Sequence, residues 1–533
     1  MVGAPCVTQS GDAVLRRTRR GSVTMNGMKT LGGLTASALL IGLVVVACVG
    51  DDPAATVPGT DGDGGSGACT VAQKTCSGSC VSNDDPAVGC ASMACTPCSP
   101  SVNAAASCKA GACSTSCNAG FSDCDGDPAT GCEAKTSADV ANCGACGKVC
   151  GSTNTETPTK CTSSKCVFAC KQDFGHCGTA DDLGCETNLL TSADNCGACG
   201  HSCLGGQCLG GKCQPFQLAS ASHPSGVAVA PKDVYFTFPS VPAIQRVQRD
   251  GKCTPAAPCP KDFAGTALSD PLAQIRGPSA IVSDGTTVWW TNQANGTLGK
   301  RLATGGAIVN FGPAQSTEPG YVVLAGGKIF WTSGFVNGGN TAHVSKANLD
   351  GTGVTTVAKY ALPTTTFQGF GGIAADAANV YWASQNSGVF RAAFNDAPCT
   401  EGATCSAFGS SGTAYGVAVD AQFVYWTEPG TGAGTGTIRR AAKGGGQSTV
   451  IATGQDSPKA IAVLGTFVYW GNSAAAGATG GTIRRAPQVA AQCDAAACEL
   501  VATVAAPDAI VAADDGIYWT NNDVNGGVYR LAK

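Results

Sequence analysis

Seven pairs of adjacent aromatic residues recur through residues 214–533, and all seven tryptophans of the 533-residue chain lie within them. Successive pairs are 41 to 54 residues apart. A repeat period in the forties, with several short strands in each repeat, is typical of β-propellers. The seven pairs are Tyr235–Phe236, Trp289–Trp290, Phe330–Trp331, Tyr381–Trp382, Tyr425–Trp426, Tyr469–Trp470 and Tyr518–Trp519.

The order of segments within each repeat is constant. A small apolar segment such as 416–420 precedes the aromatic strand, and a third strand and an outer strand such as 448–454 follow it. The seventh repeat stops after its third strand, whereas residues 216–220 match the outer-strand pattern. We therefore predict an all-β fold with a seven-bladed propeller over 214–533, closed by residues 216–220. Six blades are the alternative.

The repeated positions have structural explanations. Because the aromatic pairs occupy one strand position in every repeat, we expect them in the core between blades rather than in a ligand cage. Each third strand carries one basic residue at a fixed place, and we expect these residues to bond to neighbouring blades rather than to form a ring of ligand-binding cations. They are Arg246, Lys300, Lys346, Arg391, Arg440, Arg485 and Arg530.

The motifs Tyr-Trp-Thr (425–427, 518–520) and Ile-Arg-Arg-Ala (438–441, 483–486) resemble the YWTD repeats of LDL-receptor-type propellers. The resemblance implies a β-propeller with an extracellular ligand-binding role. That family has six blades and an aspartate after its threonine, so its ligands and its aspartate network are not implied. The aspartate position here holds Asn292, Ser333, Ser384, Glu428, Asn472 and Asn521.

Cysteines dominate the segment before the propeller. Of the 32 in the chain, 24 lie between residues 69 and 213. Two units of eight, 117–169 and 170–213, share their first six cysteines at a constant shift of 53 residues, and 69–116 is a diverged first unit. An even cysteine count in an exported, glycine-rich segment predicts a disulfide framework in a loop-rich region, with connectivity left open. Zinc is the alternative, because Cys-Gly-Ala-Cys has the spacing of a zinc ribbon.

These units resemble the cysteine-rich C-G-x-C-G repeats of myxobacterial surface proteins, through NCGACGKVC at 142–150 and NCGACGHSC at 195–203. The resemblance implies a surface protein and no enzymatic chemistry.

Three further cysteine pairs lie within the propeller, each between a third and a fourth strand, and we expect them to form disulfides that staple hairpins. They are Cys253 with Cys259, Cys399 with Cys405, and Cys493 with Cys498.

The alternating acids Asp123, Asp125 and Asp127 could bind calcium through hard oxygen ligands. Because the second unit loses this alternation, a solvated acidic turn is the favoured interpretation. No other metal and no cofactor is expected.

The N-terminus has the parts of an export signal. An apolar run, 31–49, follows Lys29 and an arginine cluster. We expect the real translation start at Met25 or Met28, which would leave out all four arginines of that cluster. The end of the apolar run, Val-Val-Ala-Cys48, resembles the lipobox of bacterial lipoproteins. We therefore expect 1–47 to be removed, Cys48 to carry lipid, and 48–68 to form a flexible tether. Plain secretion and a membrane span are the alternatives.

Charge and composition narrow the function. A formal net charge of −4 gives no basic surface for nucleic acid. With four histidines and no nucleophile elbow, zinc-protease motif or phosphate loop, an enzyme such as a propeller lyase or glycosidase is disfavoured. We expect a membrane-anchored protein of the outer membrane or cell surface that displays the propeller to bind an extracellular glycan or protein. A structural role in a surface assembly is the alternative.

Polar residues after the aromatic pairs are the expected ligand contacts. Uncharged amides suit recognition by shared hydrogen bonds, although the same residues also form turns. The predicted ligand-binding residues are Asn292, Gln293, Gln385, Asn386, Glu428, Asn472, Asn521, Asn522 and Asp523.

Lipidation at Cys48 is directly testable. A Cys48→Ala variant should lose processing and move from the membrane to the soluble fraction, because the thiol is the site of attachment. Metabolic labelling with a palmitate analogue, followed by fractionation, measures this. Membrane association and processing that both remain unchanged would contradict the lipid anchor.

Overall fold

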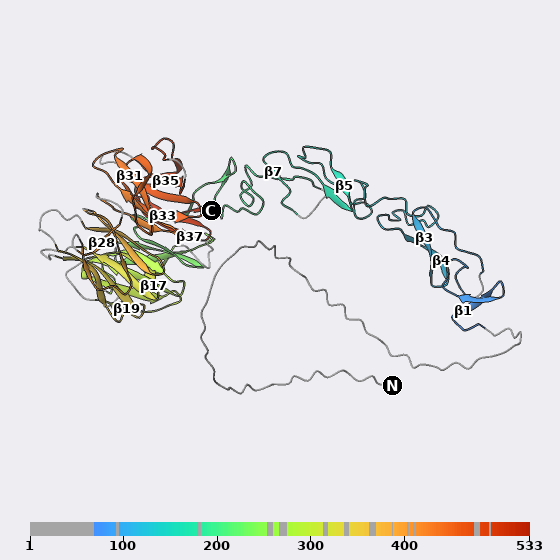
Figure 1. Ribbon diagram of the computed structural model, residues 1–533, viewed down its shortest axis with the longest axis horizontal. Coiled ribbons are helices and arrows are strands. Elements are labelled where there is room, and N and C mark those ends of the chain that lie inside the picture. The colour runs from blue at the N-terminus through green and yellow to red at the C-terminus, as the bar shows by residue number, and fades with distance from the viewer. Residues whose placement is uncertain are drawn as a thin grey trace, which may run out of the picture. The chain divides into compact units, whose positions relative to one another are not determined.

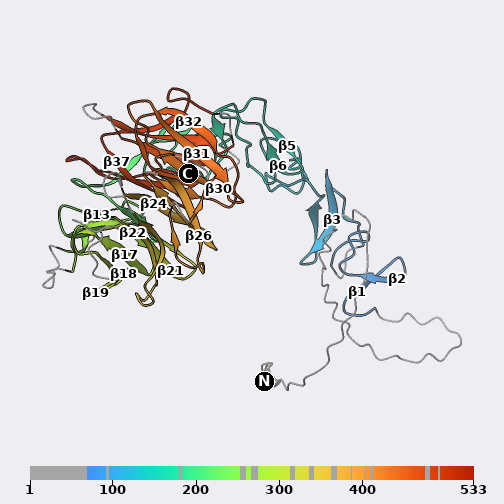
Figure 2. The ribbon, with the colours of Figure 1, turned by 60° about the vertical axis from the view of Figure 1, so that its left-hand side comes forward.

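The computed structural model describes residues 69–91, 95–178, 183–252, 260–265, 274–312, 318–334, 341–361, 369–385, 387–401, 404–408, 412–473, 480–489 and 492–533. Residues 1–68 with Cys48, and also Asn386, lie outside these ranges. The strands of 216–532, coloured green to red, gather into one body (Figures 1 and 2). In the part of the chain that is described, no helix is long and apolar enough to cross a membrane.

All 24 cysteines of residues 69–213 are paired in disulfides, so their sulfurs are not available as zinc ligands. Numbered within each unit, they join first to third, second to fifth, fourth to seventh and sixth to eighth, and the diverged first unit follows the same rule. The bonds are 69–80, 76–95, 90–108 and 98–113; 117–132, 124–146, 143–161 and 150–166; 170–185, 177–199, 196–208 and 203–213. The disulfide prediction is confirmed, and the bonds indicate an oxidising compartment.

Very little regular structure supports these units, so the cross-links replace an apolar core. Only short hairpin strands are present among the described residues: β1 (Gln73–Cys76), β2 (Ser79–Ser82), β3 (Ala104–Lys109), β4 (Ala112–Cys117), β5 (Lys160–Thr162), β6 (Lys165–Val167), β7 (Phe174–Gly175), β8 (Thr187–Asn188), β9 (Cys208–Leu209) and β10 (Lys212–Cys213).

An asparagine joins each unit to the next. Asn103 and Asn154 have φ values of 52° and 51°, in the left-handed region that asparagine tolerates better than most residues. Their side chains donate to the carbonyl oxygens of Cys132 (3.1 Å) and Cys185 (3.2 Å) of the following unit. The same bond therefore makes both junctions.

Residues 216–532 form seven sheets, one per blade, each with four antiparallel strands, which confirms the seven-bladed propeller. In blade order, from the channel outward, the strands are β12 (Val227–Val229), β13 (Asp233–Phe238), β14 (Ala243–Gln248), β15 (Lys261–Ala264); β16 (Pro278–Ser283), β17 (Thr287–Asn292), β18 (Thr297–Leu302), β19 (Gly305–Phe311); β20 (Pro319–Ala325), β21 (Lys328–Ser333), β22 (Thr341–Asn348), β23 (Thr355–Ala361); β24 (Phe370–Ala375), β25 (Asn379–Ser384), β26 (Gly388–Ala393), β28 (Ser406–Ala407); β29 (Val417–Val419), β30 (Phe423–Glu428), β31 (Gly436–Ala442), β32 (Thr449–Gln455); β33 (Pro458–Leu464), β34 (Phe467–Asn472), β35 (Gly481–Pro487), β36 (Glu499–Val504); and β37 (Pro507–Ala513), β38 (Gly516–Asn521), β39 (Gly527–Ala532), β11 (Phe216–Ser220).

Blade 7 is completed by the start of the domain. β11 pairs antiparallel with β39, with Phe216 opposite Arg530 and Ser220 opposite Gly527. This is the predicted closure, in which the two ends of the domain share one sheet.

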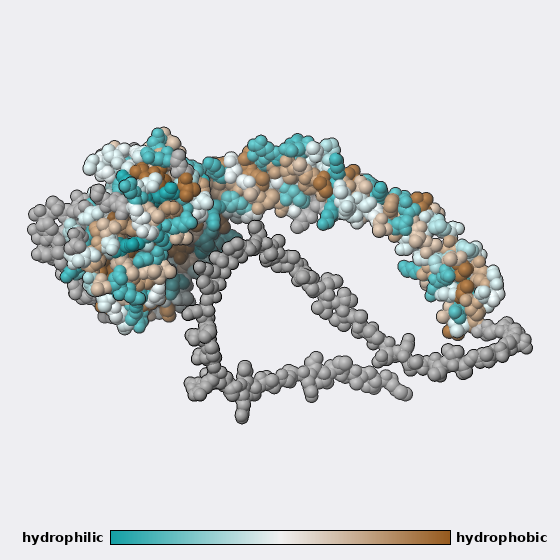
Figure 3. Space-filling view, in the orientation of Figure 1, coloured by the Kyte–Doolittle hydropathy of each residue, from teal (hydrophilic) through white to brown (hydrophobic). Residues whose placement is uncertain are grey.

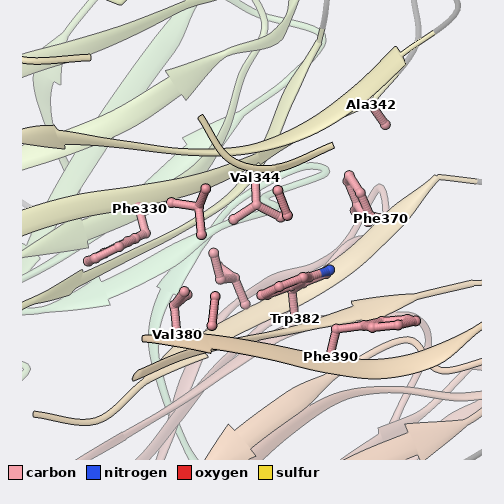
Figure 4. Close-up of a cluster of buried hydrophobic side chains, with 11 residues drawn as sticks. Phe330, Ala342, Val344, Phe370, Val380, Trp382 and Phe390 are labelled. Atoms are coloured by element: carbon pink, nitrogen blue, oxygen red, sulfur yellow. The ribbon is translucent and has the colours of Figure 1, made fainter. Parts of the chain in front are cut away.

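The aromatic pairs form the core between blades, as predicted. Successive side chains of a strand point to opposite faces of its sheet, so the two rings of a pair enter different interfaces. The first ring of each blade packs with the second ring of the next blade in all seven interfaces, from Tyr235 with Trp290 to Tyr518 with Phe236. Figure 4 shows one such cluster, with Phe330 of β21 and Trp382 of β25 among aliphatic and aromatic neighbours.

A buried threonine after the aromatic pair links neighbouring blades near the axis. The hydroxyl of Thr427 accepts from Gly416 N (2.8 Å) in its own blade and donates to Lys459 O (2.8 Å) in the next. Thr237, Thr291 and Thr520 make the same pair of bonds. Thr520 binds Ser225 O and so joins blade 7 to blade 1.

The basic residues bond to the neighbouring blade, as expected, at six of seven positions. Each donates to a backbone carbonyl that follows the third strand of the next blade: Arg246 to Ala303, Lys300 to Leu349 and Asp350, Lys346 to Phe394, Arg391 to Lys443, Arg440 to Gln488, and Arg530 to Arg249 and Asp250.

Arg485 differs, because it binds Glu499 (2.8 Å) and Tyr469 Oη (3.2 Å) within its own blade. The carbonyl that it would have reached belongs to Lys533, which accepts from His201 Nε2 of the third cysteine unit. Lys212 of that unit also binds Glu499 (2.9 Å). The third cysteine unit thus takes over an interblade bond of the propeller.

Of the three disulfides predicted within the propeller, two are confirmed: Cys399–Cys405 and Cys493–Cys498. Both members of the third predicted pair, Cys253 and Cys259, lie outside the described residues, so this bond stays a prediction.

The expectation that the two confirmed disulfides staple hairpins of their own blade was incomplete. Their loops reach back to the preceding blade, where β27 (Cys399–Thr400) pairs parallel with β23 and Cys493 forms a parallel bridge with Ala452 of β32. Each loop therefore covers an outer edge that would otherwise be unpaired.

The visible face of the propeller mixes teal, white and tan residues on a fine scale (Figure 3). This agrees with a composition in which only 13% of residues are charged, so uncharged polar groups supply much of the contact with water.

The interblade threonine bonds predict a specific stability loss. Thr520→Val should lower the free energy of unfolding by about 2 kcal/mol, because it leaves Ser225 O and Ala509 N without their partner in a buried place. Urea denaturation under non-reducing conditions measures this. The exposed Thr355→Val is the matched control and should change stability by less than about 0.5 kcal/mol; equal losses in both variants would contradict the account.

The disulfide rule predicts a peptide map. Non-reducing digestion and mass spectrometry should find the same order of pairing in all three units, with no bond between units. A cross-link between a cysteine of 117–169 and one of 170–213 would contradict it.

Candidate functional site

A channel of about 450 Å³ runs along the propeller axis, and the first strand of every blade lines it. The residues opposite the second aromatic ring are aliphatic in all seven blades, for example Val227 opposite Phe236 and Ile510 opposite Trp519. The residues one position before these aliphatic residues in the sequence form an inner ring around the mouth of the channel, and the residues two positions before them form an outer ring. They define the candidate site.

The inner ring is made of small residues with one exception. It contains Gly226, Ala280, Tyr321, Gly372, Gly416, Ala460 and Ala509. The small residues let the blades approach closely: a Cβ on Gly416 would lie 2.1 Å from Lys459 O. Tyr321 alone projects a large side chain into the channel.

The outer ring is small or polar in four blades and carries larger groups in three consecutive ones. It consists of Ser225, Ser279, Gly320, Gly371, Tyr415, Lys459 and Asp508. A group that the blade itself required would recur in every blade. Tyr415, Lys459 and Asp508 are therefore not explained by the repeat.

The large side chains contact one another across the channel. The rings of Tyr321 and Tyr415 meet edge to face, with centroids 6.3 Å apart, and Lys459 Nζ lies 5.6 Å from the Tyr415 centroid. Burial raises the pKa of Tyr321 well above its ordinary value, as do Tyr415 and Asp508. The phenol is thus a neutral hydroxyl at physiological pH, able to donate and to accept.

Asp508 is fixed at the rim. Its Oδ2 accepts from Ser225 Oγ (2.6 Å) and Asn522 Nδ2 (3.3 Å), and His223 Nδ1 lies 3.2 Å from Asn522 Oδ1. The carboxylate is exposed, so it keeps lone pairs for a ligand. Both charge signs and two aromatic rings thus share one opening.

The structure corrects the prediction for four residues. Asn292, Asn472 and Asn521 are at most 7% exposed, and each makes hydrogen bonds to neighbouring residues. Asn292 Oδ1 accepts from Trp290 Nε1 (3.0 Å), and Glu428 Oε1 accepts from Trp426 Nε1 (3.1 Å). Glu428 also pairs with Arg439 (2.7 Å).

The side chains of Asn472 and Asn521 also make hydrogen bonds to neighbouring residues. Asn472 Nδ2 donates to Gln455 Oε1 (2.9 Å), which also accepts from Trp470, and Asn521 Oδ1 accepts from Ala506 N (2.7 Å). At Asn292 and Glu428, the residue two places after a buried tryptophan accepts from the indole N–H on the same face of the strand. These two positions are therefore structural.

The other predicted residues that the structure describes lie at the channel face. Gln293 lines the channel, Gln385 N donates to Gly369 O of the lining (3.2 Å), and Asn522 supports Asp508. Asp523 Oδ1 accepts from Asn525 N (2.9 Å) and shapes the same turn.

Sequence reasoning missed Tyr321, Tyr415, Lys459 and Asp508. The signal was present, because aligning the seven first strands places three of them in one column with Ser and Gly, and Tyr321 in a column of Gly and Ala. The search for ligand contacts used only the residues after the aromatic pairs.

In the acidic turn of the second cysteine unit, the acids that lie together are not the three alternating aspartates. Asp123, Asp125 and Glu133 place carboxylate oxygens within 4.8 Å of one another, whereas Asp127 Oδ1 accepts from Ala129 N (2.9 Å). In the third unit His176 and Glu186 take the places of Asp123 and Glu133, with 3.1 Å between them. Three acids in a turn, two of them exposed, do not establish a calcium site.

A second polar cluster lies under the Cys399–Cys405 loop. Glu401 is 5% exposed, and its backbone N donates to Lys359 O (2.9 Å) of the preceding blade. Burial raises the pKa of Glu401 to about 7, with Ser384 acting in the opposite direction.

No family model and no curated protein matches this chain. Solved structures similar to it include a virginiamycin B lyase from Staphylococcus aureus, with 18% identity, a TM-score of 0.42, and coverage of 60% of this chain and 98% of that one. A streptogramin B lyase has 16% identity and a TM-score of 0.42, with coverage of 60% of this chain and 97% of that one. A chain of a nidogen/laminin complex has 17% identity and a TM-score of 0.34, with coverage of 51% of this chain and 95% of that one. No statement about function follows from similarity at this level.

The buried Glu401 predicts a pH dependence of stability. Its folded pKa of about 7 lies above the ordinary 4.5, so the folded chain favours the protonated acid. Its contribution to the free energy of unfolding should be largest below pH 4.5, fall as the pH rises to 7, and total about 3 kcal/mol. Glu401→Gln should remove this fall and be more stable than the parent above pH 7. Urea melts from pH 4 to 8 measure it, and identical pH profiles for the two proteins would contradict it.

Proposed function

We propose that this chain is a non-enzymatic, lipid-anchored surface protein whose propeller binds a carbohydrate at the mouth of its channel. The supporting observation is the break in symmetry at that mouth. The recurring strand positions of the blade serve packing, but Tyr321, Tyr415, Lys459 and Asp508 replace small residues in only four of the seven blades. Binding a ligand explains a group of side chains that the fold does not need.

The chemistry of the mouth favours a neutral, hydroxyl-rich ligand. Tyr415 and Tyr321 offer ring surface, Asp508 accepts, Lys459 donates, and Gln293 does both. A sugar presents apolar C–H faces beside hydroxyls that donate and accept. Because opposite charges share the opening, neither a strong anion nor a strong cation is favoured.

Export supports the extracellular part of the proposal. Fourteen disulfides among the described residues fit an oxidising compartment. A lipid on Cys48 and the tether 48–68 would hold the three cysteine units and the propeller at the outer membrane or cell surface.

A structural role in a surface assembly is the second candidate. The observation that favours it is the direct bonding of the third cysteine unit to the propeller, through His201 with Lys533 and Lys212 with Glu499. A scaffold requires such direct bonding between its parts. Failure of every glycan in the test below would favour this role.

The test is a glycan array with the full-length chain. Lys459→Ala and Asp508→Asn should each weaken binding at least tenfold, since each removes a polar contact at the mouth. Lys232→Ala is the matched control on an exposed lysine away from the channel and should bind normally. Equal binding by all variants would contradict the site, and chemical conversion of the bound glycan would contradict a non-enzymatic role.

A further inference from the structure

A groove of about 780 Å³ lies between the outer strand of blade 6 and the body of blade 7, on the rim of the propeller and away from the channel. β36 and the residue that follows it form one wall, and Trp519 and Tyr529 form the other. Gln214 and Pro215, just before β11, lie at its end. None of the described residues that line it is charged.

Two other outer strands of this propeller show what kind of segment pairs with the outer edge of a blade. Ala358 of β23 pairs parallel with Cys399 of the next blade. Ala452 of β32 pairs parallel with Cys493, where Thr453 N donates to Cys493 O and Cys493 N donates to Ile451 O, both at 3.0 Å. In both cases an extended segment adds to the sheet at an alanine.

β36 has the same local structure at Ala502. The outer strands β23, β32 and β36 each have one extra residue in their pairing with the third strand of the same blade. The extra residues are Val357, Ile451 and Val501, and an alanine follows each of them. Val357, Ala358, Ile451 and Ala452 are at most 4% exposed beneath their added segments. Val501 and Ala502 remain partly exposed.

The topology of blade 7 explains the difference. The added segments of blades 4 and 6 belong to loops between the third and outer strands of those blades. In blade 7 these strands are β39 and β11, which lie more than 300 residues apart in sequence, so no short loop joins them. Among the described residues, no segment pairs with the outer edge of β36.

A buried donor lines the groove. Trp519 is fully buried, and its indole N–H has no hydrogen-bond partner among the described residues. In blade 6 the matching Trp470 donates to Gln455 (2.9 Å), which stands three residues before Pro458. The residue three places before Pro507 is Val504, which has no acceptor in its side chain. An unmet buried donor costs about 1–3 kcal/mol, which a ligand carbonyl would recover.

We propose that this groove binds an extended, uncharged peptide segment of a partner protein, which pairs in parallel with β36 at Ala502. The peptide accepts from Thr503 N and donates to Val501 O, as Cys493 does on β32, and a further carbonyl accepts from Trp519 Nε1. The peptide is uncharged because the groove offers no opposite charge to pair with a buried one. This site is independent of the carbohydrate site.

The test uses the full-length chain and a fluorescein-labelled peptide, Ala-Ala-Gln-Ser-Ala-Ala. The peptide copies residues 490–495, with serine for Cys493 and alanine for Asp494. A more apolar peptide, Ala-Ala-Val-Ser-Val-Ala, is the second probe. Fluorescence anisotropy should show saturable binding of at least one, and amide hydrogen exchange at 501–503 should slow when it binds.

Two variants locate the site. Trp519→Phe and Thr503→Pro should each weaken binding at least tenfold. Trp519→Phe leaves a cavity in the interblade core but removes no hydrogen bond among the described residues, so it should lower the melting temperature less than Trp470→Phe, which also loses its bond to Gln455. Trp470→Phe is the matched control: it should lower the melting temperature and leave peptide binding unchanged. A failure of both peptides to bind at millimolar concentration, or equal binding by all variants, would overturn the proposal.

Sedimentation of the chain alone tests another occupant. The proposal expects a monomer at micromolar concentration. A dimer that Trp519→Phe dissociates would show that a second copy fills the groove, and would overturn a partner peptide.

Discussion

The division of each aromatic pair between two interfaces is the interaction on which the propeller depends. Neighbouring side chains of a strand face opposite ways, so one strand position per blade supplies a ring to both adjacent interfaces. Each interface then contains one ring from either blade, up to the last, where Tyr518 of blade 7 meets Phe236 of blade 1. The threonine after the pair adds a hydrogen bond across the same interface, as Thr520 does to Ser225 O.

This arrangement separates structural from functional residues. Positions that recur in every blade are occupied by packing and interblade bonds, so they are not free to choose a ligand. What the repeat does not explain is concentrated in two places: the polar group at the channel mouth around Lys459 and Asp508, and the groove on β36, where the Trp519 indole N–H has no hydrogen-bond partner among the described residues. Both occur where individual blades depart from the repeated pattern.

Much of the architecture could be predicted from the sequence because it depends on periodicity. The blade count, the closure by 216–220, the disulfide framework and the structural use of Arg391 all follow from a repeated pattern. The roles of Asn292 and Glu428 do not, since a turn-forming residue and a partner of a buried indole look alike until the tryptophan is placed. Nor could the sequence show that the loop of Cys493 pairs with the preceding blade, because that contact joins two outer strands that are distant in sequence.

The central claim is that the channel mouth is a binding site because it departs from the sevenfold repeat. The most direct measurement is hydrogen–deuterium exchange of the full-length chain with and without the tightest glycan from the array. The account predicts slower exchange confined to the first strands of blades 3, 5, 6 and 7, around residues 319–323, 414–418, 458–462 and 507–511. Protection spread evenly over all seven first strands, or found only in the cysteine units, would contradict it.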